Sequence, residues 1–220
     1  MTEGTTVRGR ILDIAIMLAE AKSWEAVRLQ EVAGRASLTL EDIRAEFSEK
    51  DELVDAWFDR ADRAMLTDAA ALANARLARH QRMHRAIMTW LGALAGHRRV
   101  TRQMILGKLE PGHLHLQIPA LMRVSRTVQW MREAAGYQAV FPRRALEETV
   151  HTSIYLATFS HWMSDDSVRS QRTHRFLQRQ LKWASPVFSC GIGSTQAHGH
   201  GYPPSRATPR AEVQGDRSIH

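Results

Sequence analysis

The sequence predicts an all-α protein of about nine helices that ends in a disordered tail. Apolar residues recur at i, i+3 and i+4 spacing through most of residues 7–185, which is the pattern of amphipathic helices. No segment of useful length alternates apolar and polar residues as a half-buried strand does. From residue 186 onward the composition shifts to Gly, Pro, Ser, His and Arg, which is typical of a segment that cannot bury a core.

Three short helices open the chain. The first covers residues 7–22 and the second covers about residues 28–36. Thr39 begins the third, and Asp42 follows it at the spacing of a capping box, with Asp in place of the preferred Glu. Because only a tight turn separates the second helix from the third, the segment has the pattern of a helix-turn-helix.

The later helices are longer, and Pro, Gly and Ser residues separate them. We expect them to run from Glu49 into the seventies and then to cover about residues 82–95, 100–109, 119–135, 143–163 and 168–185. The helix of residues 143–163 is apolar or small on nearly every side beyond Val150, which predicts burial in a core or an interface. The expected division is a helix-turn-helix domain in residues 1–50, a larger helical domain in residues 51–185 and the tail in residues 186–220.

The positive charge of the chain lies away from the predicted helix-turn-helix. The formal net charge is +7, and a positive balance suggests a polyanionic partner. Residues 1–60, however, hold 8 Lys/Arg against 13 Asp/Glu, a net charge of −5, whereas residues 61–185 hold 19 against 8, a net charge of +11. The domain that would touch a nucleic acid is therefore acidic.

Composition and motifs exclude several classes of protein. One cysteine, Cys190, permits neither an internal disulfide framework nor a cysteine zinc cluster, and this favours a reducing, cytoplasmic setting. No apolar run reaches the roughly 18 residues of a transmembrane helix. The sequence has no nucleophile elbow, phosphate loop or His-Glu-x-x-His motif, so we expect no enzyme, and we predict no cofactor and no bound metal.

Residues 29–53 resemble, without a gap, the N-terminal domain of TetR-family transcriptional regulators. The resemblance rests on the apolar positions of the second helix, the turn, the recognition helix and the opening of the fourth helix: Leu29, Val32, Ala33, Ala36-Ser37-Leu38-Thr39, Ile43, Phe47, Lys50 and Leu53. The order of the predicted helices also resembles that of the family over about residues 7–185. The resemblance implies a repressor-like regulator that binds double-stranded DNA, and a ligand-binding and dimerisation domain in residues 51–185 whose last two helices form a homodimer.

The resemblance implies a set of DNA-contacting residues in and around the recognition helix. Arg44 would make a bidentate contact to guanine, Glu41 or Asp42 would accept from cytosine and Lys50 would bind a phosphate. Thr39 would cap the helix, with Arg8 and Arg10 adding backbone contacts. The predicted DNA-binding residues are Arg28, Thr39, Leu40, Glu41, Arg44 and Lys50.

The sequence departs from the family pattern at positions that concern DNA. Ser37 stands where the family usually has glycine, and Arg44 and Glu46 stand where it usually has aromatic residues that contact phosphates. The recognition helix carries three carboxylates and one guanidinium. Genuine DNA binding and a helix-turn-helix that has lost this function both remain open.

A second family resemblance offers a different function. A ubiquinone-biosynthesis accessory family shares the TetR fold but acts as a lipid-binding partner of a hydroxylase. The segment Trp162-Met163-Ser164-Asp165-Asp166-Ser167 is similar to its C-terminal part. Ordinary TetR-like regulators also have this pattern, so it discriminates weakly, whereas the acidic recognition helix fits the lipid-binding function better.

The TetR resemblance also implies a pocket for a small hydrophobic or lipid-like ligand among the middle helices. Its predicted lining residues, each of which could instead be plain core, are Trp90, Met104, His113, Leu121, Trp130, Tyr155 and Phe159. His113 and His115 could chelate zinc only with a third ligand such as Glu110, and a loop or capping role is favoured. The arginines of residues 98–132 predict either a solvated face or a patch for an anionic headgroup.

Overall fold

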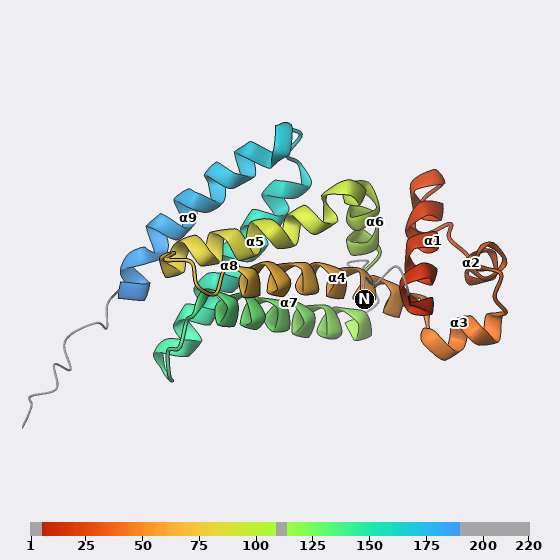
Figure 1. Ribbon diagram of the computed structural model, residues 1–220, viewed down its shortest axis with the longest axis horizontal. Helices are drawn as coiled ribbons and strands as arrows, with labels where there is room; N and C mark the ends of the chain where they lie inside the picture. The colour runs from red at the N-terminus through yellow and green to blue at the C-terminus, as the bar shows by residue number, and fades with distance from the viewer. Residues whose placement is uncertain (1–5, 109–113, 190–220) are drawn as a thin grey trace, which may run out of the picture. The chain divides into compact units, whose positions relative to one another are not determined.

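The computed structural model describes residues 6–108 and 114–189, and these residues form an all-α protein, as predicted (Figure 1). The α-helices are α1 (Val7–Ala21), α2 (Leu29–Ala36), α3 (Leu40–Glu46), α4 (Lys50–Ala71), α5 (Arg79–Leu94), α6 (Arg98–Lys108), α7 (Leu114–Ala135), α8 (Arg143–Met163) and α9 (Gln171–Ser189). Two short 3-10 helices, Ala95–His97 and Val168–Ser170, precede α6 and α9. The predicted tail lies outside the described residues, apart from its first four, which α9 includes.

Helices α1, α2 and α3 pack against one another as the helix-turn-helix spacing predicts. The capping box of α3 is confirmed, because Thr39 Oγ1 accepts from Asp42 N at 3.1 Å and Asp42 Oδ2 accepts from Thr39 N at 2.8 Å. Ser37 ends α2 with a φ of 55°, the left-handed conformation that glycine adopts without cost. The serine therefore keeps the turn geometry that the family usually builds with glycine.

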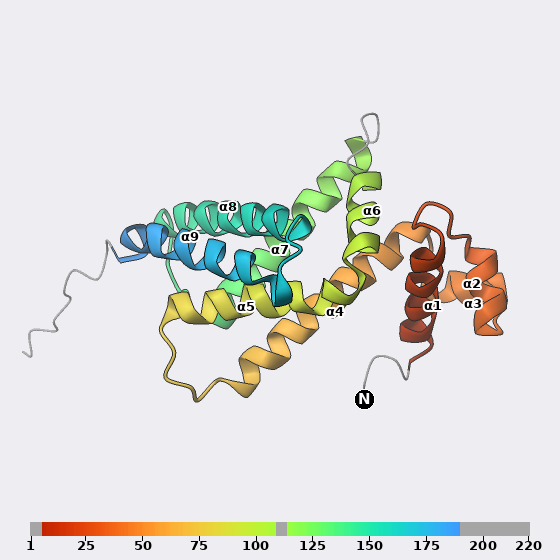
Figure 2. The ribbon, with the colours of Figure 1, turned by 90° about the horizontal axis from the view of Figure 1, so that it is seen from above.

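Helices α4 to α9 bury a core that contains three of the chain's tryptophans. Trp57, Trp90 and Trp162 are almost fully buried. Helix α5 packs against α4, α7 and α9, and α8 and α9 run side by side (Figure 2). No helix of residues 6–108 and 114–189 combines the length and the apolarity needed to cross a membrane.

Several helix ends differ from the predicted ones. Helix α7 begins at Leu114 rather than at Pro119, so Pro119 lies inside the helix and not in its first turn. Helix α5 begins at Arg79, three residues early, with Gln81 Oε1 accepting from the N–H of the capping residue. Helix α9 continues through Pro186, whereas the change in composition predicts that the helix ends before residue 186.

Candidate nucleic-acid interface and ligand pocket

Helix α3 presents its predicted base-reading side chains to solvent. The buried side chain of Ile43 anchors the helix to the domain, while the side chains of Arg44 and Glu41 are 77% and 81% exposed. Arg44 Nη1 lies 3.8 Å from Glu41 Oε2, and an exposed pair of this kind contributes little stability. Leu40 is also half exposed. These three residues are therefore free to meet a partner, and so is the exposed Arg28 at the start of α2.

The carboxylates of α3 do not all serve the same purpose. Asp42 is committed to the capping box, and the backbone and hydroxyl hydrogen bonds from Thr39 hold the pKa of Asp42 below its usual range. Thr39 is likewise occupied by the cap, as the sequence predicts. At the other end of the helix, Arg8 of α1 donates to the Glu46 carbonyl, and its guanidinium lies 4.0 Å from the centroid of the Phe47 ring. Arg8 thus adds a positive charge beside α3.

Lys50 has a structural role that the sequence does not reveal. Its Nζ donates to the carbonyls of Trp24, Glu25 and Val27 at 2.7, 3.1 and 2.9 Å, and it lies 5.0 Å from the centroid of the Trp24 ring. All three N–H groups of the ammonium are used, so none is left for the predicted phosphate contact. Burial, followed by the charge of Arg28, lowers the pKa of Lys50. The side chain ties the segment before α2 to the start of α4.

Three of the predicted pocket residues come together in the core. Trp90 makes edge contacts with Tyr155 and Phe159, with ring centroids 5.5 and 5.9 Å apart, and Phe58 stacks on Trp90 at 5.8 Å. The three predicted residues therefore belong to an aromatic cluster of the core. Of the other four, Met104 is buried in α6 and Trp130 is half exposed on α7, whereas His113 and the side chain of Leu121 lie outside the described residues.

A buried carboxylate, which no sequence pattern indicates, lies next to this cluster. Asp62 of α4 accepts from Trp90 Nε1 at 2.7 Å and from Thr127 Oγ1 at 3.1 Å. Arg123 of α7 reaches Asp62 at 3.3 Å and Asp59 at 2.7 Å. Burial raises the pKa of Asp62, and its hydrogen bonds and Arg123 oppose that rise. This polar centre joins α4, α5 and α7.

Most arginines of residues 98–132 are tied to protein acceptors instead of forming an anionic-headgroup patch. Arg132, which is nearly buried, pairs with Glu147 at 3.3 Å. Arg99 pairs with Glu20 of α1 at 3.2 Å, and Arg102 donates to the Met163 carbonyl. The basic charge that the sequence assigns to this region is therefore largely neutralised or used in packing.

The Trp-x-x-Asp-Asp-Ser pattern forms a structural turn between α8 and α9. Asp165 accepts four hydrogen bonds, from the N–H and hydroxyl groups of Ser167 and Thr173, at 2.6 to 2.9 Å. Burial alone would raise the pKa of Asp165, but these bonds outweigh it and hold the pKa well below its usual range. Arg98 donates to the Asp165 carbonyl and, at 3.0 Å, to Ser170 Oγ. The pattern is therefore explained by the fold.

Helix α6 connects this turn with the N-terminal domain. Besides Arg98 and Arg102, which hold the end of α8, its Gln103 Oε1 accepts from the Trp24 N–H at 2.8 Å. Thr101 Oγ1 accepts from Trp57 Nε1 of α4 at 3.0 Å. One helix thus contacts three parts of the chain.

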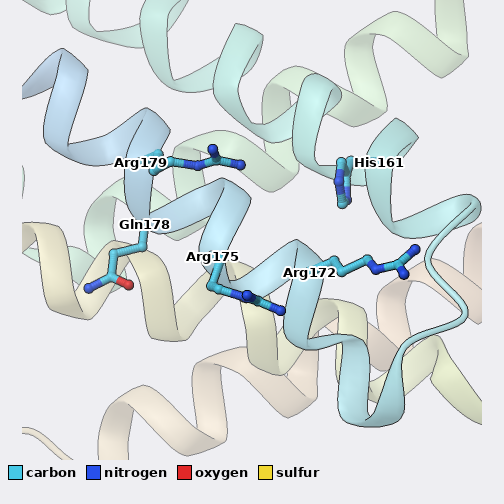
Figure 3. A pocket seen from close by; sticks show the side chains of 5 residues that line it. All are labelled: His161, Arg172, Arg175, Gln178 and Arg179. Carbon is cyan, nitrogen blue, oxygen red and sulfur yellow. The ribbon is translucent and has the colours of Figure 1, made fainter.

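An uncompensated basic hollow lies where α8 ends beside α9 (Figure 3). Its volume is about 580 Å³, and its lining residues are His161, Arg172, Arg175, Gln178 and Arg179. None of the three guanidinium groups has a carboxylate within 4.0 Å among the described residues. In Figure 3, Arg172 and Arg179 extend toward the side of α8 that carries His161. Across residues 6–108 and 114–189, no group of three or more His, Cys, Asp or Glu residues is arranged to hold a metal ion.

Two solved structures resemble the chain over most of its length. The TetR transcriptional regulator from Nitrosomonas europaea ATCC 19718 is 53% identical, with a TM-score of 0.72 over 81% of this chain and 97% of that one. A TetR transcriptional regulator from Rhodococcus sp. RHA1 is 20% identical, with a TM-score of 0.59 over 79% and 92%, and supports the fold alone. No protein-family model and no curated protein matches the chain.

Proposed function

Because the chain belongs to the TetR family of transcriptional regulators, we propose that it is a homodimeric DNA-binding regulator whose DNA affinity a small hydrophobic ligand controls. The observation that carries this proposal is the 53% identity to a TetR transcriptional regulator over nearly all of that protein's length. The exposed face of α3 supports it, because a short helix capped at Thr39 and anchored by Ile43 can enter a major groove.

The proposed DNA contacts follow from what α3 leaves exposed. Arg44 reads guanine through its two parallel N–H groups, Glu41 accepts from cytosine and Leu40 contacts a thymine methyl group. Arg28 and Arg8 contact phosphates, which position the helix without reading sequence. With few phosphate contacts, affinity depends weakly on salt, because each contact contributes a slope of about −0.9 to the dependence on log salt concentration.

The proposed dimer uses the exposed faces of α8 and α9. Leu146 and Leu156 are 56% and 41% exposed, and Trp183 of α9 is 85% exposed. Small residues continue the line on α8 at helical spacing, at Thr149, Ser153, Ala157 and Ser160. Large exposed apolar side chains on one surface are typical of an interface, and a two-fold axis would pair that surface with itself.

The proposed regulation acts through α4. This helix begins at Lys50, which holds the segment before α2, and continues to the buried Asp62 centre. A ligand that favours one position of α4 would change the separation of the two α3 helices in the dimer. DNA binding weakens if the ligand binds the two arrangements unequally.

The test is to incubate the purified full chain with sheared genomic DNA of its source at two salt concentrations and to sequence what it retains. We expect a palindromic sequence to be enriched at both concentrations. No enrichment at low salt would refute the proposed DNA binding. If native mass spectrometry then also detected a co-purified isoprenoid lipid, the lipid-binding accessory function would be favoured instead.

A matched pair of variants separates base reading from general attraction to DNA. Arg44→Ala should remove the preference at one or two positions of the palindrome, at a cost of about 10- to 100-fold in affinity for the preferred site. Arg35→Ala removes the same charge from exposed α2 and should leave the preferred sequence unchanged. If Arg44→Ala leaves every position of the sequence preference intact, α3 does not read bases through this side chain.

A further inference from the structure

A narrow cleft opens at the end of the bundle where α4 connects to α5. Its volume is about 320 Å³, and α4, α5, α7 and the connecting segment line it. Figure 2 shows this connection between the end of α4 and the start of α5. The walls are mainly alanine and leucine side chains with the buried Met65, and α7 contributes Ala134. Three charged residues share the cleft, namely Asp68, Arg82 and Arg85.

Two of these charges neutralise each other. Arg85 Nε and Nη2 donate to the two oxygens of Asp68 at 2.7 and 2.8 Å, a bidentate pair. The bond from Arg85 lowers the pKa of Asp68, so this carboxylate stays ionised at neutral pH. The pair therefore contributes no net charge to the cleft, and the guanidinium of Arg82 is left as its uncompensated cation.

Arg82 is held in place but is incompletely satisfied. Its Nη2 donates to the Ala75 carbonyl at 3.3 Å, which fixes the guanidinium beside the connecting segment. Its Nε is buried and has no hydrogen-bond partner among the described residues. No carboxylate lies within 4.0 Å of this guanidinium in residues 6–108 and 114–189. A buried donor without an acceptor is costly, and an ionised acceptor is the partner that lowers this cost most.

The cleft is matched to a ligand with two chemically different ends. A volume of about 320 Å³ lies at the lower end of the range for small-molecule sites, so the ligand must be small. The alanine- and leucine-lined walls suit an apolar portion, and Arg82 suits one negative charge. Arg82 lies in the first turn of α5, where the helix dipole also favours an anion.

We propose that this cleft binds a small amphipathic carboxylate, with its carboxylate on Arg82 and its apolar portion along the alanine-lined wall. The ligand contacts α4 directly through Met65 and Ala69. The assignment of this ligand as the effector of DNA binding rests on the proposed function, whereas the binding site itself does not.

The test uses octanoate as the probe, titrated into the full chain without DNA and followed by isothermal titration calorimetry at physiological salt. 1-Octanol and octylammonium have the same apolar portion with a neutral and a cationic end. We expect octanoate to bind about tenfold more tightly than 1-octanol, because a charge-assisted hydrogen bond contributes about this factor, and octylammonium to bind more weakly than both.

Matched variants assign the binding to Arg82. Arg82→Gln should lower the affinity for octanoate about tenfold, to that of 1-octanol. Arg79→Gln removes the same charge from an exposed position of the same helical turn and should leave the affinity within about twofold. Ala134→Leu fills the cleft without changing its charge and should abolish binding of both octanoate and 1-octanol.

Three results would overturn the proposal: no octanoate binding at millimolar concentration, equal binding by Arg82→Gln and the unaltered chain, or unchanged binding by Ala134→Leu. If Arg82→Gln does not fold, Ala134→Leu decides, with circular dichroism to show that it is folded. The two proposals fail separately. A chain that selects DNA but binds no octanoate refutes the carboxylate site alone, and one that binds octanoate but selects no DNA refutes the regulator alone.

Discussion

The N-terminal domain and the helical bundle behind it place their charged groups in different ways. In the N-terminal domain, charged side chains satisfy backbone groups, as Lys50 does for three carbonyls and Asp42 does at the start of α3. The bundle has such contacts too, as Arg98 and Arg102 donate to carbonyls, but it also buries charged side chains against one another, as in the Arg132–Glu147 and Arg123–Asp62 pairs.

This difference indicates which charged side chains are available to bind a partner and which are needed for stability. The backbone-directed contacts hold α1 to α3 together and leave the outer face of α3 free for a partner. The buried pairs of the bundle are stable only while both partners are present and ionised, because an unpaired buried charge is strongly unfavourable. We therefore expect stability to depend on charge mainly in the bundle, and partner binding to depend on charge mainly in the N-terminal domain.

The largest expected effect is on the buried pair of α7 and α8. Glu147, with a side chain 3% exposed, accepts from Arg143 at 2.7 Å and from Arg132 at 3.3 Å. Glu147→Gln leaves Arg132 buried without its closest counter-charge and should lower the free energy of unfolding by about 4 kcal/mol. Urea denaturation measures this loss. Glu133→Gln, at an exposed position on α7, should change it by less than about 0.5 kcal/mol.

The second prediction concerns the stability in acid of the buried residues around Arg132. Burial, followed by the charge of Arg132, lowers the pKa of His151 to about 4. The unfolded chain binds this proton near pH 6.5, so stability is lost as the pH falls from about 6.5 to about 4, by about 3 kcal/mol in total.

His151→Gln removes this titration and should therefore flatten the part of the pH profile that belongs to it. The measurement is urea denaturation at pH 7.5 and pH 5, where the unaltered chain should lose about 2 kcal/mol more than the variant does. His80→Gln, at an exposed position, should leave the profile unchanged. Equal losses in the unaltered chain and in His151→Gln would show that His151 is not the group responsible.

The third prediction tests whether Lys50 belongs with the structural charges. Lys50→Met leaves three carbonyls without their donor and should lower the free energy of unfolding by about 2 kcal/mol. Lys22→Met removes an exposed ion-pair partner and should cost less than about 0.5 kcal/mol. If Lys50→Met instead keeps full stability and reduces the salt slope of DNA binding by about 1, the side chain contacts a phosphate.

The smallest expected effect is on the charge of α3. Glu46 lies at the end of the helix and is not assigned to a base, so its carboxylate only opposes the phosphates. Glu46→Gln should strengthen DNA binding by about two- to threefold at low salt, and less at high salt because the charge is screened. Glu133→Gln makes the same change in net charge far from α3 along the chain, so equal strengthening by both variants would contradict a local effect.

Local features of the structure were predictable from the sequence, and contacts between distant segments were not. The capping box of Thr39 and Asp42 and the short turn after α2 depend on neighbouring residues, so spacing reveals them. The role of Lys50 depends on the direction of carbonyls more than twenty residues away. The burial of Asp62 depends on where Trp90 and Thr127 lie, and no spacing within α4 indicates it.

The residues of a ligand site also could not be predicted from the sequence, because they depend on contacts between distant segments. Trp90, Tyr155 and Phe159 are large apolar residues, and whether such residues pack together or line a pocket depends on how three helices approach one another. The cleft beside Arg82 is lined mainly by alanine and leucine, which carry no sequence signal for binding. Arg82 is one of 30 basic residues in the sequence. Its charge is identified as uncompensated only in the structure, where Asp68, the carboxylate of the cleft, is paired with Arg85.

The contacts of α6 have a consequence for the operator. In the proposed dimer, α8 and α9 form the interface at the two-fold axis. Arg98 and Arg102 of α6 donate to the carbonyls of Asp165 and Met163, at the end of α8 and just beyond it. Gln103 then fastens α6 to the segment before α2. An 11-residue helix is about 16 Å long and stiff. In that dimer, α6 would hold each recognition helix at a set distance from the two-fold axis, and this distance would determine the number of base pairs between half-sites.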